Sequence, residues 1–221
     1  MATGTEGYYQ ARALEYDRVY DKPERQDDLR RLRDWLAGAL AGKRVLELAA
    51  GTGYWTDVYA DRASRVLATD VSEAPLAVAA ARRAWPATVT FAKADAFTLA
   101  GVNGGFDVVF AGFFWSHVPL ESLGSFLATL ADRQGHAGAL IFMDNRYVAG
   151  SSHPISRTDS HGNTYQQREL SDGSRWEVLK NFPSAPQLRS RLAPIARAVE
   201  ITELAYYWTA ECDLGNALHS G

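Results

Sequence analysis

One short stretch holds the residues best suited to chemistry, where a buried strand runs into a turn with two glycines. Residues 45–53 read Val-Leu-Glu-Leu-Ala-Ala-Gly-Thr-Gly, and the apolar ones are typical of a fully buried parallel strand. Gly51 and Gly53 let the backbone bend sharply and approach a ligand, because no Cβ stands in the way. Glu47 adds an acid, and the helix expected from Tyr54 turns its free N–H groups toward the same place. This arrangement predicts a site for a nucleotide-like cofactor.

The spacing of the glycines disfavours a dinucleotide. The fingerprint G-x-G-x-x-G would place its third glycine at position 56, where this chain has Thr56. The next apolar run, 65–70, ends in Asp70, about where a ribose diol would lie, and a carboxylate there accepts hydrogen bonds from both hydroxyls. The alternative for Asp70 is a helix N-cap, although Ser72 is better placed for that role. These residues therefore favour a nucleoside.

The elements that position these residues alternate along the chain. Strands are expected at about 43–49, 65–70, 87–92, 106–112 and 138–144, with helices at about 53–63, 73–84 and 119–132. Two last strands, at about 195–203 and 205–212, lie too close together for a helical crossover and are expected to pair antiparallel. The pattern predicts an α/β fold: a Rossmann-like, seven-stranded, mostly parallel sheet with helices on both faces and an antiparallel last strand.

A segment after the fifth strand departs from this alternation. It carries Asp172-Gly173 between two alternating runs, which is typical of a β-hairpin. An insertion at this point emerges at the carboxyl ends of the parallel strands, where open α/β sheets bind ligands. We therefore expect residues 146–182 to form a lid over a substrate site.

Four motifs follow one another along the chain: E-L-A-A-G-T-G at 47–53, T-D-V-S at 69–72, K-A-D-A-F at 93–97 and F-D-V-V-F-A-G at 106–112. In this order and spacing they resemble the cofactor motifs of class I S-adenosylmethionine-dependent methyltransferases. Further segments, including 8–17 and His117-Val118-Pro119, are similar to small bacterial O-methyltransferases of natural-product pathways, a subgroup that includes a phosphonate O-methyltransferase. The resemblance implies S-adenosylmethionine as cofactor and S-adenosylhomocysteine as its spent form.

The resemblance also implies roles for individual residues. Asp95 would accept from the adenine amino group while the Ala96 N–H meets the ring, a solvated loop acid being the alternative for Asp95. Gly112 and Phe113 would lie beside the methionine portion, although Phe113 is equally typical of a core aromatic. The expected cofactor-binding residues are Tyr16, Glu47, Gly51, Gly53, Trp55, Asp70, Val71, Asp95, Ala96, Gly112 and Phe113.

His117 is the candidate general base. It follows the fourth strand, in the crevice where acceptor and methyl group must meet. A base adds on the order of 10²–10⁴-fold if the acceptor is a hydroxyl, whereas an ionised carboxylate or phosphonate needs none. The alternative is a histidine that packs against the helix opening at Pro119.

Cations and the N-terminal segment are the candidates for acceptor binding. Arginine suits bidentate recognition of carboxylate or phosphonate, so cations on the insertion favour an anionic acceptor. Solvent-facing hairpin residues are the alternative. In similar enzymes the N-terminal segment folds over the cofactor, where Arg12 would pair with a carboxylate and Tyr16 would close the pocket. The expected substrate-binding residues are Tyr9, Arg12, Arg146, Arg168 and Lys180.

Composition sets the class of protein. The 221 residues are 47% hydrophobic and 22% charged, which suits one core. We expect a single domain, 1–221, with cap helices at 1–42, a cofactor core at 43–145, the lid, and a C-terminal helix and strands at 183–221. A formal net charge of −3 disfavours nucleic acid as a partner. The chain shows no signal peptide and no apolar run of about 20 residues that would span a membrane.

Together these features predict a cytoplasmic methyltransferase, monomeric or homodimeric, that acts on a small molecule. No residue spacing indicates a metal site. We expect an oxygen acceptor (hydroxyl, carboxylate or phosphonate) in bacterial secondary metabolism. An N-methyltransferase acting on a small amine or heterocycle, and a non-catalytic protein that binds S-adenosylmethionine, remain the alternatives.

Overall fold

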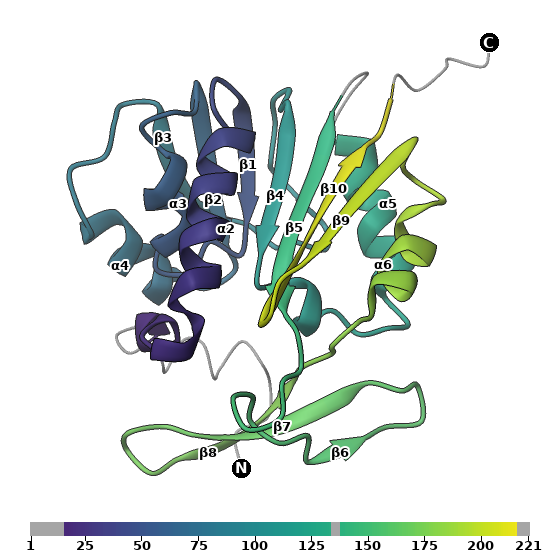
Figure 1. The fold of residues 1–221 in the computed structure, drawn as a ribbon. Coiled ribbons are helices and arrows are strands. Elements are labelled where there is room, and N and C mark those ends of the chain that lie inside the picture. The colour runs from purple at the N-terminus through teal and green to yellow at the C-terminus, as the bar shows by residue number, and fades with distance from the viewer. Residues whose placement is uncertain (1–15, 134–137, 216–221) are drawn as a thin grey trace.

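The main sheet has the predicted seven strands, in the order β3-β2-β1-β4-β5-β10-β9 (Figure 1). The computed structural model describes residues 16–133 and 138–215. Neighbouring strands from β3 to β5 pair parallel, whereas β10 pairs antiparallel with both β5 and β9. This confirms the predicted fold class. The strands are Arg44–Leu48 (β1), Arg65–Asp70 (β2), Val89–Lys93 (β3), Val108–Gly112 (β4), Ala139–Asn145 (β5), Ala198–Glu203 (β9) and Tyr207–Asp213 (β10).

Helices cover both faces because successive residues of a strand point in opposite directions. In β1, Leu46 lies in a core formed with α5 (Leu123–Arg133) and α6 (Ala185–Leu192). Its neighbour Val45 lies in a second core, formed with α2 (Gln26–Ala39) and α3 (Tyr54–Tyr59). A further helix, α4 (Glu73–Ala81), contacts β2 and β3. The motif turn after β1 is therefore fixed between two packed layers.

The start of α5 differs from the sequence prediction. The expected start at 119 is wrong, because residues 119–122 form a turn in which the Ser122 N–H donates to the Pro119 carbonyl at 3.0 Å. The Leu120 N–H donates to Asn163 Oδ1 at 2.8 Å. A short 3-10 helix, η3 (Trp115–His117), precedes the turn. Where the first turn of the helix was expected, the chain thus forms a turn that donates a long-range hydrogen bond to the insertion.

The insertion after β5 forms a separate sheet of three strands. Thr164–Glu169 (β7) and Arg175–Leu179 (β8) make the predicted hairpin, and Arg157–Thr158 (β6) adds an edge that the sequence did not indicate. At the turn, Gly173 has φ +80°, a conformation that glycine adopts without strain. The small sheet lies across the carboxyl-terminal end of the main sheet (Figure 1).

Two 3-10 helices, η1 (Tyr16–Tyr20) and η2 (Pro23–Arg25), lead into α2. Predicted substrate residues Tyr9 and Arg12 lie outside the described residues. For Tyr16 only the backbone is described. Within 16–133 and 138–215, none of the helices has the length and apolar character that crossing a bilayer requires.

Candidate active site

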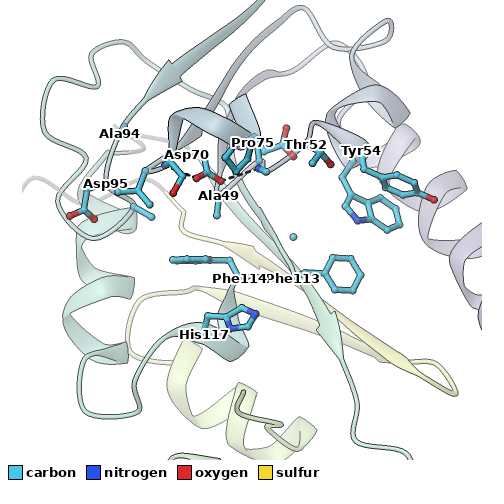
Figure 2. A pocket seen from close by; sticks show the side chains of 18 of the residues that line it. Ala49, Thr52, Tyr54, Asp70, Pro75, Ala94, Asp95, Phe113, Phe114 and His117 are labelled. Carbon is cyan, nitrogen blue, oxygen red and sulfur yellow. Dashed lines mark hydrogen bonds between the residues drawn. The ribbon is translucent and has the colours of Figure 1, made fainter. Parts of the chain in front are cut away.

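A cavity of about 330 Å³ opens at the carboxyl ends of β1 to β4. That volume is within the range of small-molecule sites, which begins at roughly 300 Å³. Its wall comes from the loops that follow the four strands, so residues distant in sequence meet there (Figure 2). The lining includes ten of the residues singled out from the sequence: Glu47, Gly51, Trp55, Asp70, Val71, Asp95, Ala96, Gly112, Phe113 and His117.

Asp70 is held in place by the backbone on both sides. One carboxylate oxygen accepts the Gly51 N–H at 3.0 Å and the other accepts the Ser72 N–H at 2.9 Å. Ser72 is the N-cap residue of α4, so Asp70 is not the cap itself. A carboxylate has about four acceptor positions, so one carboxylate can accept from several donors at once.

Asp95 and the aromatic residues lie around the same cavity. Asp95 accepts the Phe97 N–H at 2.7 Å. Figure 2 shows Asp95 and Asp70 toward one end and Tyr54 toward the other, with Phe113, Phe114 and His117 facing them. The cavity therefore has a polar wall opposite an aromatic one.

Glu47 is buried, with 2% of its surface exposed, yet it lines this cavity. Its Oε2 accepts from Thr56 Oγ1 at 2.6 Å and from the Tyr59 hydroxyl at 2.7 Å. Burial raises the pKa of Glu47 to about 7, although these two hydrogen bonds oppose that change. Both hydrogen bonds fall on one oxygen, which leaves Oε1 as the acceptor for a ligand.

The two motif glycines differ in what they do. Gly51, at φ +57°, lines the cavity, and a Cβ there would meet no atom within 4 Å. Gly53, at φ +71°, is not in the lining, and a Cβ there would lie 3.0 Å from Ala79 Cβ in α4. A side chain at Gly53 would therefore crowd α4, so packing explains this glycine, and its expected contact with the cofactor stays a prediction.

A second cavity, of about 200 Å³, adjoins the first. Tyr20 and Phe113 line both. Tyr20 stacks on Tyr54 with ring centroids 4.1 Å apart, and its hydroxyl accepts from Trp55 Nε1 at 2.9 Å. These aromatic rings form the boundary between the two cavities. The sequence did not identify Tyr20, because nothing in its own segment marks it.

The second cavity is basic. No Asp or Glu of the described chain lines it, and Gln166, His153, Asn145, Ser151 and Ser152 are among its polar residues. Its cationic residues are Arg18, Lys22, Arg25, Arg168 and Lys180.

Of the predicted substrate residues, Arg168 and Lys180 therefore reach this cavity and Arg146 does not. Arg146 donates to the Leu204 carbonyl and pairs with Glu203 at 3.4 Å, both near the turn between β9 and β10. That local carboxylate draws the guanidinium toward the turn; the place of Arg146 in the substrate site stays a prediction, and these contacts count against it.

His117, Lys180 and Asp144 form a buried network between the cavities. His117 Nδ1 lies 2.7 Å from the Leu179 carbonyl, which only accepts, so Nδ1 carries the hydrogen. Its Nε2 lies 3.5 Å from Lys180 Nζ. Lys180 Nζ also donates to Asp144 at 3.2 Å and to Ser116 Oγ at 2.6 Å.

The charges of this network follow from burial and proximity. Burial, together with the positive charge of Lys180, lowers the pKa of His117 to about 3. Burial also lowers the pKa of Lys180, and Asp144 opposes that change. For Asp144, burial acts to raise the pKa, but the charge of Lys180 and the N–H donors of Ser116 and Asn145 act against it, and the net shift is downward. Lys180 and Asp144 are an ion pair, and His117 is neutral beside them.

Known proteins resemble this chain over its cofactor segment and over its whole length. A family model described as a methyltransferase domain matches residues 45–136. The structure of DhpI in complex with S-adenosylhomocysteine (SAH) has a TM-score of 0.73 and 30% identity, covering 96% of this chain and 95% of that one. DhpI in complex with S-adenosylmethionine (SAM) and a compound abbreviated HEP has a TM-score of 0.75 and 29% identity, covering 96% and 99%.

A curated relative matches over a shorter region. Demethylmenaquinone methyltransferase of Renibacterium salmoninarum is 37% identical over 100 residues, which are 44% of this chain and 41% of that protein. The match therefore spans about two fifths of the length of that relative.

The methyltransferase family model and the likeness to a protein solved with SAM and with its spent form agree on the cofactor, which is S-adenosylmethionine. The seven-stranded, mostly parallel sheet with its antiparallel last strand, and the cavity at the carboxyl ends of its strands, agree with the sequence prediction. The chain belongs to the class I S-adenosylmethionine-dependent methyltransferases.

Proposed function

We propose that this methyltransferase transfers the methyl group to an oxygen of a small anionic acceptor, such as a carboxylate or a phosphonate. The observation that carries the proposal is the second cavity, which five cations and no carboxylate of the described chain line. Its volume of about 200 Å³ suits a small molecule. The two cavities share Tyr20 and Phe113, so an acceptor in one adjoins a methyl donor in the other.

The residues of the first cavity suit S-adenosylmethionine. When bound, the cofactor supplies a methyl group that its sulfonium makes electrophilic. Asp70 presents acceptors for the ribose hydroxyls, and Asp95 with Ala96 lies where the adenine is expected. Glu47 offers Oε1 to the ammonium group of the methionine portion, and Trp55 and Phe113 line the aromatic wall. Gly51 leaves open space where a side chain would project.

An anionic acceptor removes the need for a base. A general base must be able to take up a proton and keep it near the working pH. The pKa of His117 is lowered to about 3, so its imidazole binds a proton only weakly there. The general-base role of His117 stays a prediction, and this environment counts against it. We infer that neutral His117 instead accepts from Lys180 and orients that ammonium toward the acceptor.

Lys180 and Arg168 supply charge on the lid side of the cavity. Lys180 is fixed by Asp144 and Ser116, so its position is set before the acceptor arrives. Arg168 donates to Gln166 Oε1 at 2.7 Å, which orients its guanidinium in β7. Preorganised cations hold the acceptor oxygen in place, and such positioning can contribute on the order of 7–11 kcal/mol in favourable reactions.

An acceptor panel tests the proposal. Purified protein is incubated with S-adenosylmethionine and matched carboxylates, phosphonates, neutral alcohols and amines, and SAH release is measured. We expect turnover of the anionic acceptors, with methyl esters as products. Turnover confined to amines or neutral alcohols would contradict the proposal.

A substitution at His117 tests the absence of a base. With an anionic acceptor, we expect His117→Gln to lower kcat by less than about tenfold and to leave the pH profile unchanged, because no proton is removed. A loss on the order of 10²-fold or more, together with loss of one limb of the profile, would instead establish His117 as the base.

A further inference from the structure

Four of the five cations of the second cavity fall into two groups, and the fifth, Arg18, belongs to η1. Arg168 and Lys180 come from the lid, whereas Lys22 and Arg25 come from η2 and the residue before it. Lys180 lies 3.5 Å from His117, which lines the cofactor cavity. By contrast, the hydrogen-bond and ring partners of Arg25 all lie outside the lining of that cavity.

Arg25 is a buried cation, with 4% of its surface exposed. Its Nε and Nη2 donate to Ser151 Oγ at 3.0 and 2.9 Å, and its Nη1 donates to Asn145 Oδ1 at 3.2 Å. It also lies over the Tyr206 and Tyr207 rings, 5.2 and 5.6 Å from their centroids. None of these direct partners is charged, but Ser151 Oγ also donates to Glu24 Oε1 at 2.7 Å, which places a carboxylate one hydrogen bond beyond the guanidinium.

Lys22 adds a second cation at the same place. Its Nζ donates to the Ser151 carbonyl, so Ser151 holds both cations. Within the described chain, neither Lys22 nor Arg25 forms an ion pair with a carboxylate. Lys180 differs, since Asp144 offsets its charge.

A chain of hydrogen bonds through Asp144 and Asn145 runs from Lys180 in one group to Arg25 in the other. Asp144 Oδ1 accepts from both Lys180 Nζ and Asn145 Nδ2, and Asn145 Oδ1 accepts from Arg25. Asp144 and Asn145 therefore stand between Lys180 and Arg25 at the end of β5. A buried cation whose direct partners are all neutral is costly, and an anion supplied by a ligand lowers that cost.

From this arrangement we propose that Arg25 and Lys22 form a second anion-binding subsite, which holds a non-reacting anionic group of the acceptor while the reacting oxygen lies near Lys180 and the cofactor cavity. The preferred acceptor then carries two anionic groups. This inference rests on the proposed function, because it assigns a further group to the same anionic acceptor.

Calorimetry with two matched probes tests the subsite. Phosphonoacetate carries a phosphonate and a carboxylate, and phosphonoacetamide replaces the carboxylate with a neutral amide of similar shape. Each is titrated into protein loaded with SAH. We expect phosphonoacetate to bind about 10- to 100-fold more tightly, as for a charge-assisted hydrogen-bonded pair.

Variants assign that preference to the subsite. Arg25→Gln is expected to bring the ratio of the two affinities close to one, and Lys22→Met to reduce it, while Arg25→Lys retains part of it. The control is Arg175→Gln, since Arg175 is an exposed cation of β8 that pairs with Glu169 and does not line the cavity. Retained SAH binding shows that a variant is folded, and Lys22→Met decides the matter if Arg25→Gln does not fold.

The outcomes separate this inference from the proposed function. If both probes bind the wild type equally, or if neither Arg25→Gln nor Lys22→Met changes their ratio, the subsite is overturned while the anionic acceptor stands. If neither probe binds, the anionic acceptor fails and the subsite fails with it.

Discussion

Glu47 is an acid at a position where its own charge is costly. Two hydroxyl donors support one oxygen, yet burial raises the pKa to about 7. The folded-state pKa exceeds the ordinary value of 4.5, so the ligand-free folded chain binds this proton more tightly than the unfolded chain. The stability that results is present below pH 4.5 and is lost as the pH rises through about 7. A ligand ammonium beside Oε1 would reverse this preference.

We therefore expect SAH to bind more tightly as the pH rises, with affinity changing by up to about tenfold per pH unit below the pKa of Glu47 and levelling above it. The reason is that binding must release the proton from Glu47 when it is protonated. Calorimetry between pH 5.5 and 8 in buffers of different ionisation enthalpy measures both affinity and proton release.

The variant Glu47→Gln should bind SAH weakly and without this pH dependence. Glu169→Gln, on the exposed hairpin, is the control and should behave as the wild type. An unchanged pH dependence in Glu47→Gln would show that another group carries the effect.

Residues were predictable from the sequence where a motif is local. Glu47, Asp70 and Asp95 follow consecutive strands, and parallel strands bring their carboxyl ends to one edge. Arg25 was not predictable, because its place depends on Ser151, more than a hundred residues away along the chain. The position of the Arg146 side chain was not predictable for the same reason, since its guanidinium pairs with Glu203 of another strand.

At the scale of elements, hydrogen bonds from several residues attach the insertion after β5 to the rest of the chain. The Asn181 N–H donates to the Ser116 carbonyl at 2.8 Å, just before His117. The buried Asn181 side chain accepts the Thr164 N–H at 2.9 Å and donates to the Val118 carbonyl at 3.2 Å. This one side chain therefore connects β7 of the lid to the loop after β4.

Replacing Asn181 with Ala should loosen that connection. The substitution leaves buried donors and acceptors without partners, which costs about 1–3 kcal/mol for each such group. We expect a lower melting temperature and a higher KM for the acceptor, with little change in SAH affinity. Asn103→Ala is the control, because Asn103 is exposed and its side chain makes a long 3.4 Å hydrogen bond. An equal loss of acceptor and SAH binding would show that the whole site depends on Asn181.

Helices and strands were predictable from the sequence where the pattern of apolar residues is local to the element. The strands of the main sheet begin and end within three residues of the expected positions, because β1, β2, β4 and β5 are rich in apolar residues and the last two strands are separated by a short turn. The start of α5 was not predictable, since nothing in the sequence near Leu120 indicates that its N–H donates to the distant Asn163. The edge strand β6 has only two residues, too few for a pattern.

At the scale of the whole molecule, net charge and local charge have opposite signs. The chain has a formal net charge of −3, yet five cations and no carboxylate of the described residues line the second cavity. A concave surface of one sign focuses its field, so the cavity attracts anions in spite of the net charge. Composition alone could not predict this, because the cations come from η1, η2 and the lid, which only the fold brings together.

This asymmetry predicts a specific dependence on salt. Raising NaCl from about 0.05 to 0.5 M shortens the screening length from more than 10 Å to less than 5 Å. We expect the KM for an anionic acceptor to rise severalfold, because screening weakens its attraction to the cavity. The dissociation constant of SAH, a zwitterion without net charge, serves as the internal reference and should change less, because screening weakens chiefly the attraction of a ligand with net charge. Arg168→Gln should reduce the salt dependence for the acceptor alone. An SAH dissociation constant that rises as steeply as the acceptor KM would remove the charge of the cavity as the cause.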